Sequence, residues 1–173
     1  MTQNLLIQDP NAAAVEAAAE LARLTGAPTH DVALVLGYEG RARYLRDDEL
    51  ATWLVGVEGA HQQALANLAR RSVSARFSEV LTDSGVIVIA RSGDGLDASR
   101  LLLPGLFDVL SRVLEGPIVA GVPHRDTLVA TSARGNALEV LRARVKDDAA
   151  RAPHRISTGL FEVTSHGLRH FAA

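Results

Sequence analysis

Two short polar segments of this sequence carry the residue types that could do chemistry. The first segment is Gly93-Asp94-Gly95-Leu96-Asp97-Ala98-Ser99-Arg100, and the second is Val122-Pro123-His124-Arg125-Asp126. Both combine carboxylates with a guanidinium group, and both lie where a predicted strand ends. Because small domains commonly build sites from loops that rigid elements hold in place, we expect these two segments to come together in space.

The charges of the two segments support two interpretations. In the first, a bidentate pair between Arg125 and a carboxylate such as Asp97 neutralises both groups and holds the two loops together. In the second, Arg125 binds an anionic group and Asp97 or Asp126 acts as a general base, as in a small-molecule site or a hydrolase. The structural interpretation is favoured, because partly buried Arg–Asp pairs more often fix loops than perform chemistry.

Two known motifs are only partly matched. Gly93-x-Gly95-x-x-Ala98 between a strand and a helix is similar to a dinucleotide-binding loop, but Asp94 and Asp97 would place negative charge beside the diphosphate. His124-Arg125-Asp126 is similar to a kinase catalytic loop, but Thr131 stands where asparagine is needed, and no Asp-Phe-Gly motif occurs. Neither motif predicts a cofactor.

Nucleophilic and metal chemistry have weaker support. Ser99 or Ser157 could be a nucleophile with His124 as base, but no Gly-x-Ser-x-Gly elbow occurs and serines at helix starts are usually caps. A metal site would need several of the scattered acids and histidines to converge. His166 and His170 are spaced four apart like a ligand pair, but they lie in a predicted tail where no helix is expected to present them. We therefore expect no metal.

The composition is that of a globular protein. The 173 residues are 47% hydrophobic and 22% charged, as expected for a chain with one compact core. The formal net charge is −2, and arginines alternate with acids, so neither a nucleic acid nor a membrane surface is an expected partner. Cysteine is absent, and no apolar run reaches the roughly 18 residues of a membrane span. The expected location is the cytoplasm.

The hydrophobic pattern predicts alternating helices and hairpins. Apolar runs bounded by glycine, proline and aspartate predict strands, and apolar residues three or four apart predict helices. Asn136 and Glu139 resemble a capping box, and Pro104 kinks or restarts a helix. Strands are expected at residues 32–36, 41–45, 75–82, 85–91, 117–122, 126–131 and 159–164, and helices at residues 11–25, 47–55, 58–68, 97–116 and 136–149.

This order predicts an α+β fold. Short links between consecutive strands favour hairpins, and hence a mostly antiparallel mixed sheet of about six to seven strands with helices packed on it. Residues 1–30 are expected to be an alanine-rich helical segment, residues 31–164 a single domain, and residues 165–173 a flexible tail.

From about residue 31 to residue 163 the chain resembles an uncharacterised bacterial family, domain of unknown function 1444. The order and spacing of several short motifs carry the resemblance, although the alanine-rich start is shorter than in that family. It implies a cluster of motif residues but no activity, substrate or cofactor. The matching stretches are Asp31–Val35, Arg43–Leu45, Asp48–Leu50, Ala64–Leu68, Gly95–Leu103, Val122–Asp126, Ile156–Ser157 and Leu160–Phe161. The polar residues at motif positions are Asn67, Asp97, Ser99, Arg125 and Asp126.

These observations predict a cytoplasmic binding or protein-interaction module without catalytic activity. Its partner is expected to be a protein, and a second copy of the chain is one candidate, with the alanine-rich first helix as the interface. The alternative is an anion-binding or hydrolytic site built from Asp97, Ser99, Arg125 and Asp126.

Overall fold

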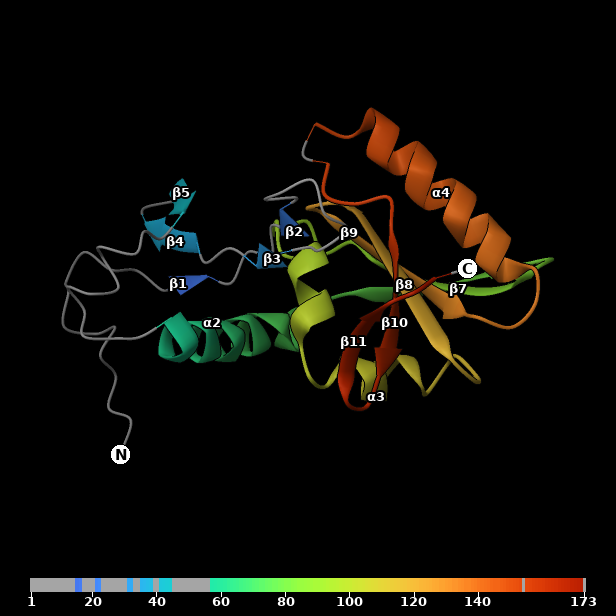
Figure 1. Cartoon of the computed structure of the whole chain (residues 1–173), viewed down its shortest axis with the longest axis horizontal. Coiled ribbons are helices and arrows are strands. Elements are labelled where there is room, and N and C mark those ends of the chain that lie inside the picture. Colours follow the sequence, from blue (N-terminus) through green and yellow to red (C-terminus); the bar gives the residue numbers. More distant parts are fainter. Residues whose placement is uncertain are drawn as a thin grey trace. The chain divides into compact units, whose positions relative to one another are not determined.

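The computed structural model describes residues 15–16, 21–22, 31–32, 35–38, 41–44, 57–153 and 155–172 (Figure 1). The chain divides into two compact units, residues 1–73 and 74–173. This boundary lies within the range predicted as a single domain.

The described residues of the first unit form short strands and a long helix. Strands β1 (Val15–Glu16), β4 (Val35–Tyr38) and β5 (Arg41–Tyr44) form one antiparallel sheet, and β2 (Leu21–Ala22) pairs with β3 (Asp31–Val32). Helix α2 spans Val57–Arg71. β4 and β5 confirm the predicted first hairpin, and α2 confirms the helix expected from residue 58.

The alanine-rich start differs from its prediction. Residues 15–16 form strand β1, which pairs with β4, and residues 21–22 form strand β2, which pairs with β3. They do not belong to a helix over residues 11–25. Helix propensity is a weak preference, and pairing with another strand can override it. The rest of that predicted helix, and the helix predicted at residues 47–55, lie outside the described residues.

The second unit is an α+β fold, as predicted, built on one six-stranded sheet. All neighbouring strands are antiparallel, in the order β11-β10-β8-β9-β7-β6. Each strand reproduces a predicted apolar run to within about two residues, except β11. The strands are β6 (Phe77–Thr82), β7 (Gly85–Ala90), β8 (Ile118–His124), β9 (Thr127–Ser132), β10 (Leu160–Thr164) and β11 (Gly167–His170).

The same turn closes the hairpin at each edge of this sheet. The Thr82 hydroxyl donates to the Gly85 carbonyl at 2.7 Å, and Gly85 has φ +129°. In the β10–β11 hairpin, the Thr164 hydroxyl donates to the Gly167 carbonyl at 2.8 Å, with φ +122° at Gly167. Glycine is needed at both places because other residues rarely adopt this conformation.

The β10–β11 turn corrects the prediction of a loose tail after residue 164. Strand β11 pairs with β10, the Phe171 backbone N–H donates to the Leu160 carbonyl at 2.9 Å, and Phe171 packs on the core. The polar residues of this segment hid the strand, because an edge strand exposes most of its side chains.

Helix α4 (Ala137–Arg151) covers one face of the sheet. Leu141 and Val145 of the helix join Val119, Val129 and Leu160 of the sheet in a fully buried cluster. The helix starts and ends near the predicted residues, but its start lacks a side-chain cap, so the predicted capping box is wrong.

The opposite face is covered by two short helices, with α3 on the other side of the sheet from α4 (Figure 1). The 3₁₀ helix η3 (Ala98–Leu102) packs on β8 and β9, and α3 (Leu106–Leu110) contacts β10. Pro104 separates them, as expected from its missing backbone N–H. No helix in the described part of the chain is both long and apolar enough to cross a bilayer.

Candidate functional site

The loop between β7 and η3 is folded around its own carboxylates. Gly93 and Gly95 have φ values of +76° and +77°, which let the chain turn sharply on both sides of Asp94. Asp94 Oδ1 accepts a hydrogen bond from the Leu96 backbone N–H at 3.0 Å, and Asp97 Oδ2 accepts one from the Ser92 N–H at 2.7 Å. The carboxylates therefore satisfy backbone groups that strand and helix leave unpaired.

Arg100 binds both carboxylates from the first turn of η3. Its Nη1 donates to Asp94 Oδ1 at 3.0 Å and to Asp97 Oδ1 at 2.9 Å, and its Nη2 donates to Asp94 Oδ2 at 2.5 Å. Arg100 and Asp97 are fully buried, whereas the Asp94 side chain is 29% exposed. We call Asp94, Asp97 and Arg100 the buried triad.

The positive charge of Arg100 is held by the two carboxylates. Burial lowers the pKa of Arg100, but the hydrogen bond and charge of Asp94, together with Asp97, outweigh it and raise the pKa above its usual value. Arg100 therefore stays protonated and binds both carboxylates as a cation.

The loop meets the β8–β9 turn through the backbone. The Ala98 N–H donates to the Arg125 carbonyl at 3.1 Å, and a Cβ on Gly95 would lie 3.7 Å from Arg125 Nε. The prediction that the two polar segments come together is thus confirmed.

The predicted charge pairing between the segments is wrong. Asp97 pairs with Arg100, while Arg125 pairs with its neighbour Asp126 at 3.5 Å. The Arg125 and Asp126 side chains are 50% and 39% exposed, so this pair lies at the surface. The overlooked signal was local: aspartate and arginine three residues apart face the same side of a helical turn.

The remaining two predicted site residues lie on helices. Ser99 is buried in η3. Asn67 lies on α2 in the first unit, where its side-chain oxygen accepts hydrogen bonds from Gln63 and Arg70. The structure therefore brings together the segments bearing Asp97, Ser99, Arg125 and Asp126, whereas Asn67 belongs to the first unit.

Serine and histidine side chains near the turn are also engaged locally. The Ser157 hydroxyl accepts from the Gly159 N–H at 2.9 Å, and His124 Nδ1 accepts from the Asp126 N–H at 3.3 Å. The Ile156 and Ser157 N–H groups donate to the Pro123 and Val122 carbonyls. The segment before β10 is therefore also bonded to β8. These contacts are those of side chains that stabilise turns.

Three backbone amides of the loop are not available to a phosphate. A phosphate cradle needs backbone amides that point at the ligand from a helix N-terminus. Here the Ser92, Leu96 and Ala98 amides all donate within the protein. No cluster of three histidine, aspartate or glutamate side chains suited to a metal occurs in the part of the chain that the structure describes.

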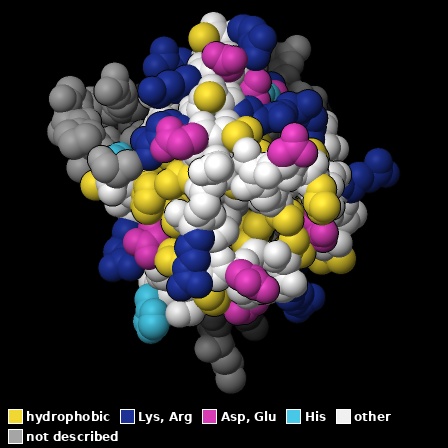
Figure 2. All heavy atoms as spheres, turned by 90° about the vertical axis from the view of Figure 1, so that its right-hand side faces the viewer, with side chains coloured by type: hydrophobic (Ala, Val, Ile, Leu, Met, Phe, Trp, Pro, Cys, Tyr) yellow, Lys and Arg dark blue, Asp and Glu magenta, His cyan; other side chains and the backbone are white. Residues whose placement is uncertain are grey.

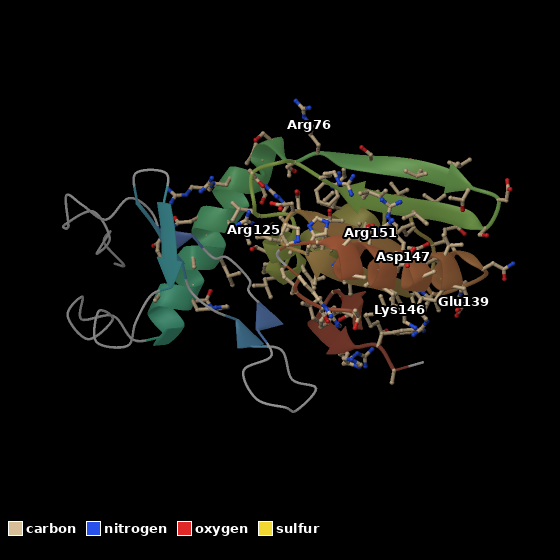
Figure 3. All side chains as sticks on the ribbon, turned by 90° about the horizontal axis from the view of Figure 1, so that it is seen from above. Arg76, Arg125, Glu139, Lys146, Asp147 and Arg151 are labelled. Atoms are coloured by element: carbon tan, nitrogen blue, oxygen red, sulfur yellow. The ribbon has the colours of Figure 1, made fainter. Side chains whose placement is uncertain are left out.

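A groove lies on the other side of the unit, between α4 and the β6–β7 hairpin. It has a volume of about 450 Å³, with apolar strand residues as its floor and charged α4 residues as its wall. Asp147 and Arg151 project from successive turns of α4 (Figure 3). The lining residues are Val80, Thr82, Ile87, Ile89, Val140, Arg144, Asp147, Asp148 and Arg151.

The charged wall of the groove is paired along the helix. Arg144 Nε lies 3.4 Å from Asp148 Oδ2, and Arg151 Nη2 lies 3.7 Å from Asp148 Oδ1. These pairs hold both signs of charge close together, so the groove has no strong preference for an anion or a cation.

The comparisons connect the chain with an uncharacterised bacterial family. A UPF0354 protein of Halalkalibacterium halodurans is 29% identical over 85 residues, which is 49% of this chain and 31% of that protein. A UPF0354 protein of Staphylococcus epidermidis is 26% identical over 92 residues, 53% of this chain and 32% of that protein. One from Bacillus cereus is 24% identical over 101 residues, 58% and 37% respectively.

The chain thus spans about a third of the length of the curated relatives it matches. Neither a family model nor a solved structure matches it. The relatives are proteins of unknown function, so they bring no activity to the site.

Proposed function

We propose that this chain is a protein-interaction domain without catalytic activity, and that strand β6 is the element that contacts the partner. The observation that carries the proposal is the unpaired outer side of this strand. β6 is an edge of the six-stranded sheet, and no segment in the described part of the chain pairs with its outer side.

The side chains of β6 also favour a partner. Leu81 is 82% exposed and Val80 is 40% exposed, and the strand contains no proline. Proteins usually protect an edge strand by prolines, bulges, several charges or a covering segment, because its open backbone groups recruit other strands. Glu79 is the one charged residue within β6, so charge does little to prevent another strand from pairing with this edge.

The buried triad supports a structural role for the polar loops. A general base must reach its substrate, but the Asp97 side chain is fully buried and bonded to Arg100 and to the Ser92 amide. A buried charge of this kind fixes the loop and the turn beside it.

The alternative is an anion-binding or hydrolytic site at the turn. Arg125 favours it, because half of its side chain is exposed and Asp126 is its single ion-pair partner among the described residues. In that case Arg125 would bind the anion, and Asp126 would supply the base.

A thermal-shift screen separates these functions. Inorganic phosphate, sulfate and dicarboxylates would be added to the wild type, to Arg125→Ala and to Arg112→Ala, an exposed arginine outside the cluster that serves as a control. A ligand at a hundred times its dissociation constant stabilises by about 2.7 kcal/mol. We expect no stabilisation. Stabilisation that Arg125→Ala removes and Arg112→Ala keeps would establish the alternative.

Two finer assignments belong to the same proposal. The run from Gly95 to Leu103 and the run from Val122 to Asp126 support membership of the family called domain of unknown function 1444. The absence of cysteine supports a location in the cytoplasm.

A further inference from the structure

We infer that the partner of β6 is a second copy of this chain, and that the two β6 strands pair antiparallel with Val80 of one copy opposite Val80 of the other. This inference rests on the proposed function and names its partner. The two copies would continue one sheet across a two-fold axis that passes between the two Val80 residues.

The backbone of β6 presents the groups that this pairing needs. In the β6–β7 hairpin, Thr82 lies opposite Gly85 across a two-residue turn, so Thr82, Val80 and Ser78 direct their backbone groups toward β7. The residues between them then direct theirs outward. The Val86 carbonyl confirms this alternation: it points away from its partner Leu81 and accepts from the Thr131 hydroxyl on β9 at 2.6 Å.

The outward groups define which residues can bond between copies. With Val80 at the axis, Glu79 of each copy lies opposite Leu81 of the other. The N–H and C=O of both residues point outward, so each such pair exchanges two hydrogen bonds. The central valines form the closer, non-hydrogen-bonded pair, in which β-branched side chains interact favourably.

Charge and overlap select this register over its neighbours. A shift that puts Glu79 at the axis places two glutamates directly opposite each other. A shift that puts Leu81 at the axis places Glu79 opposite Asp83, again with like charges. Both arrangements are destabilising, and a shift to Ser78 at the axis leaves just Phe77–Glu79 of β6 to overlap.

The surface around β6 is compatible with a two-fold axis. Because the axis stands perpendicular to the sheet, α4 of both copies would lie on the same face, and the two grooves would open toward each other over Val80. The groove wall carries both signs of charge, so the two walls do not meet as surfaces of like net charge. On the face shown in Figure 2, basic and acidic side chains are likewise interspersed with hydrophobic ones.

Sedimentation of the full chain with complementary variants tests the inference. Wild type should show a concentration-dependent dimer. Val80→Lys and Val80→Glu should each weaken dimerisation at least about tenfold, which corresponds to ~1.4 kcal/mol, because like charges meet at the axis. An equimolar mixture of the two variants should restore the dimer, because opposite charges then meet. The controls Val140→Lys and Val140→Glu alter a groove residue of similar exposure, 38% against 40%, and should dimerise like wild type.

The backbone provides a second measurement that needs no variant. Hydrogen exchange at the Glu79 and Leu81 amides should slow as protein concentration rises, whereas exchange at the Leu168 amide of the opposite edge strand should not change. A wild type that stays monomeric up to about 1 mM overturns the inference. A dimer with unchanged exchange at Glu79 and Leu81, or a mixture that stays monomeric, overturns it too. The ligand screen tests the proposed function separately, so the two failures are distinguishable.

Discussion

Replacing Arg100 by methionine should destabilise the second unit strongly. The change removes three hydrogen bonds to carboxylates, with lengths of 2.5, 2.9 and 3.0 Å, and keeps an unbranched side chain in place of the arginine stem. Hydrogen bonds to charged groups contribute about 1.5–3 kcal/mol each, but they are not additive within one cluster. Asp97 would remain buried without its cation, and breaking a buried ion pair from one side costs about 3–5 kcal/mol. We expect a loss in that range.

Equilibrium urea unfolding measures the effect. The matched control is Arg112→Met, the same chemical change at an exposed arginine, which should alter the free energy of unfolding by less than about 0.5 kcal/mol. A loss below about 1 kcal/mol for Arg100→Met would mean that water or a rearranged loop compensates Asp97, and would refute the reasoning.

A double-mutant cycle tests the coupling inside the triad. Asp97→Asn keeps an acceptor for the Ser92 amide but removes the charge that Arg100 faces. In the presence of Arg100→Met this substitution should cost at least about 1 kcal/mol less than it does alone. Additive losses would show that Asp97 and Arg100 act independently.

Three further substitutions test the packing of the sheet. Gly121→Ala places a Cβ 2.5 Å from Val145 Cγ2 and 3.1 Å from Leu160 Cδ2, so it should cost about 1–3 kcal/mol in urea unfolding, whereas Gly105→Ala has open space and should be nearly neutral. Leu141→Ala removes a fully buried side chain under α4 and should cost about 2–5 kcal/mol, against less than about 1 kcal/mol for its neighbour Val140→Ala, which is 38% exposed. Phe171→Ala should lower the melting temperature, because Phe171 packs on the core; an unchanged melting temperature would show that this contact adds no stability.

Much of the second unit could be predicted from local patterns. The runs Gly85–Ala90, Ile118–Val122 and Thr127–Thr131 are apolar and bounded by turn residues, so their strands and hairpins follow from the sequence. Leu141 and Val145 lie four apart, which identifies the buried side of α4. These elements were predictable because burial on one or two faces leaves a regular mark on the chain.

The elements that the sequence did not predict are strands whose own residues carry little apolar pattern. Gly167–His170 forms a strand because β10 offers backbone groups to it, and residues 15–16 and 21–22 pair with segments about 10–20 positions away, although their alanines favour a helix. A backbone hydrogen bond to another strand leaves no periodicity in the residues that make it.

The candidate site shows the same division. Amino-acid types alone indicated that the loop around Asp97 and the turn around Arg125 would meet, since acids, arginines and glycines at strand ends are typical of joined loops. Which arginine neutralises Asp97 was decided by geometry: η3 directs Arg100 inward onto both carboxylates, while the turn exposes half of Arg125 to water. The open edge of β6 was likewise decided by the order of strands in the sheet, because a strand's own sequence does not state how many neighbours it will have.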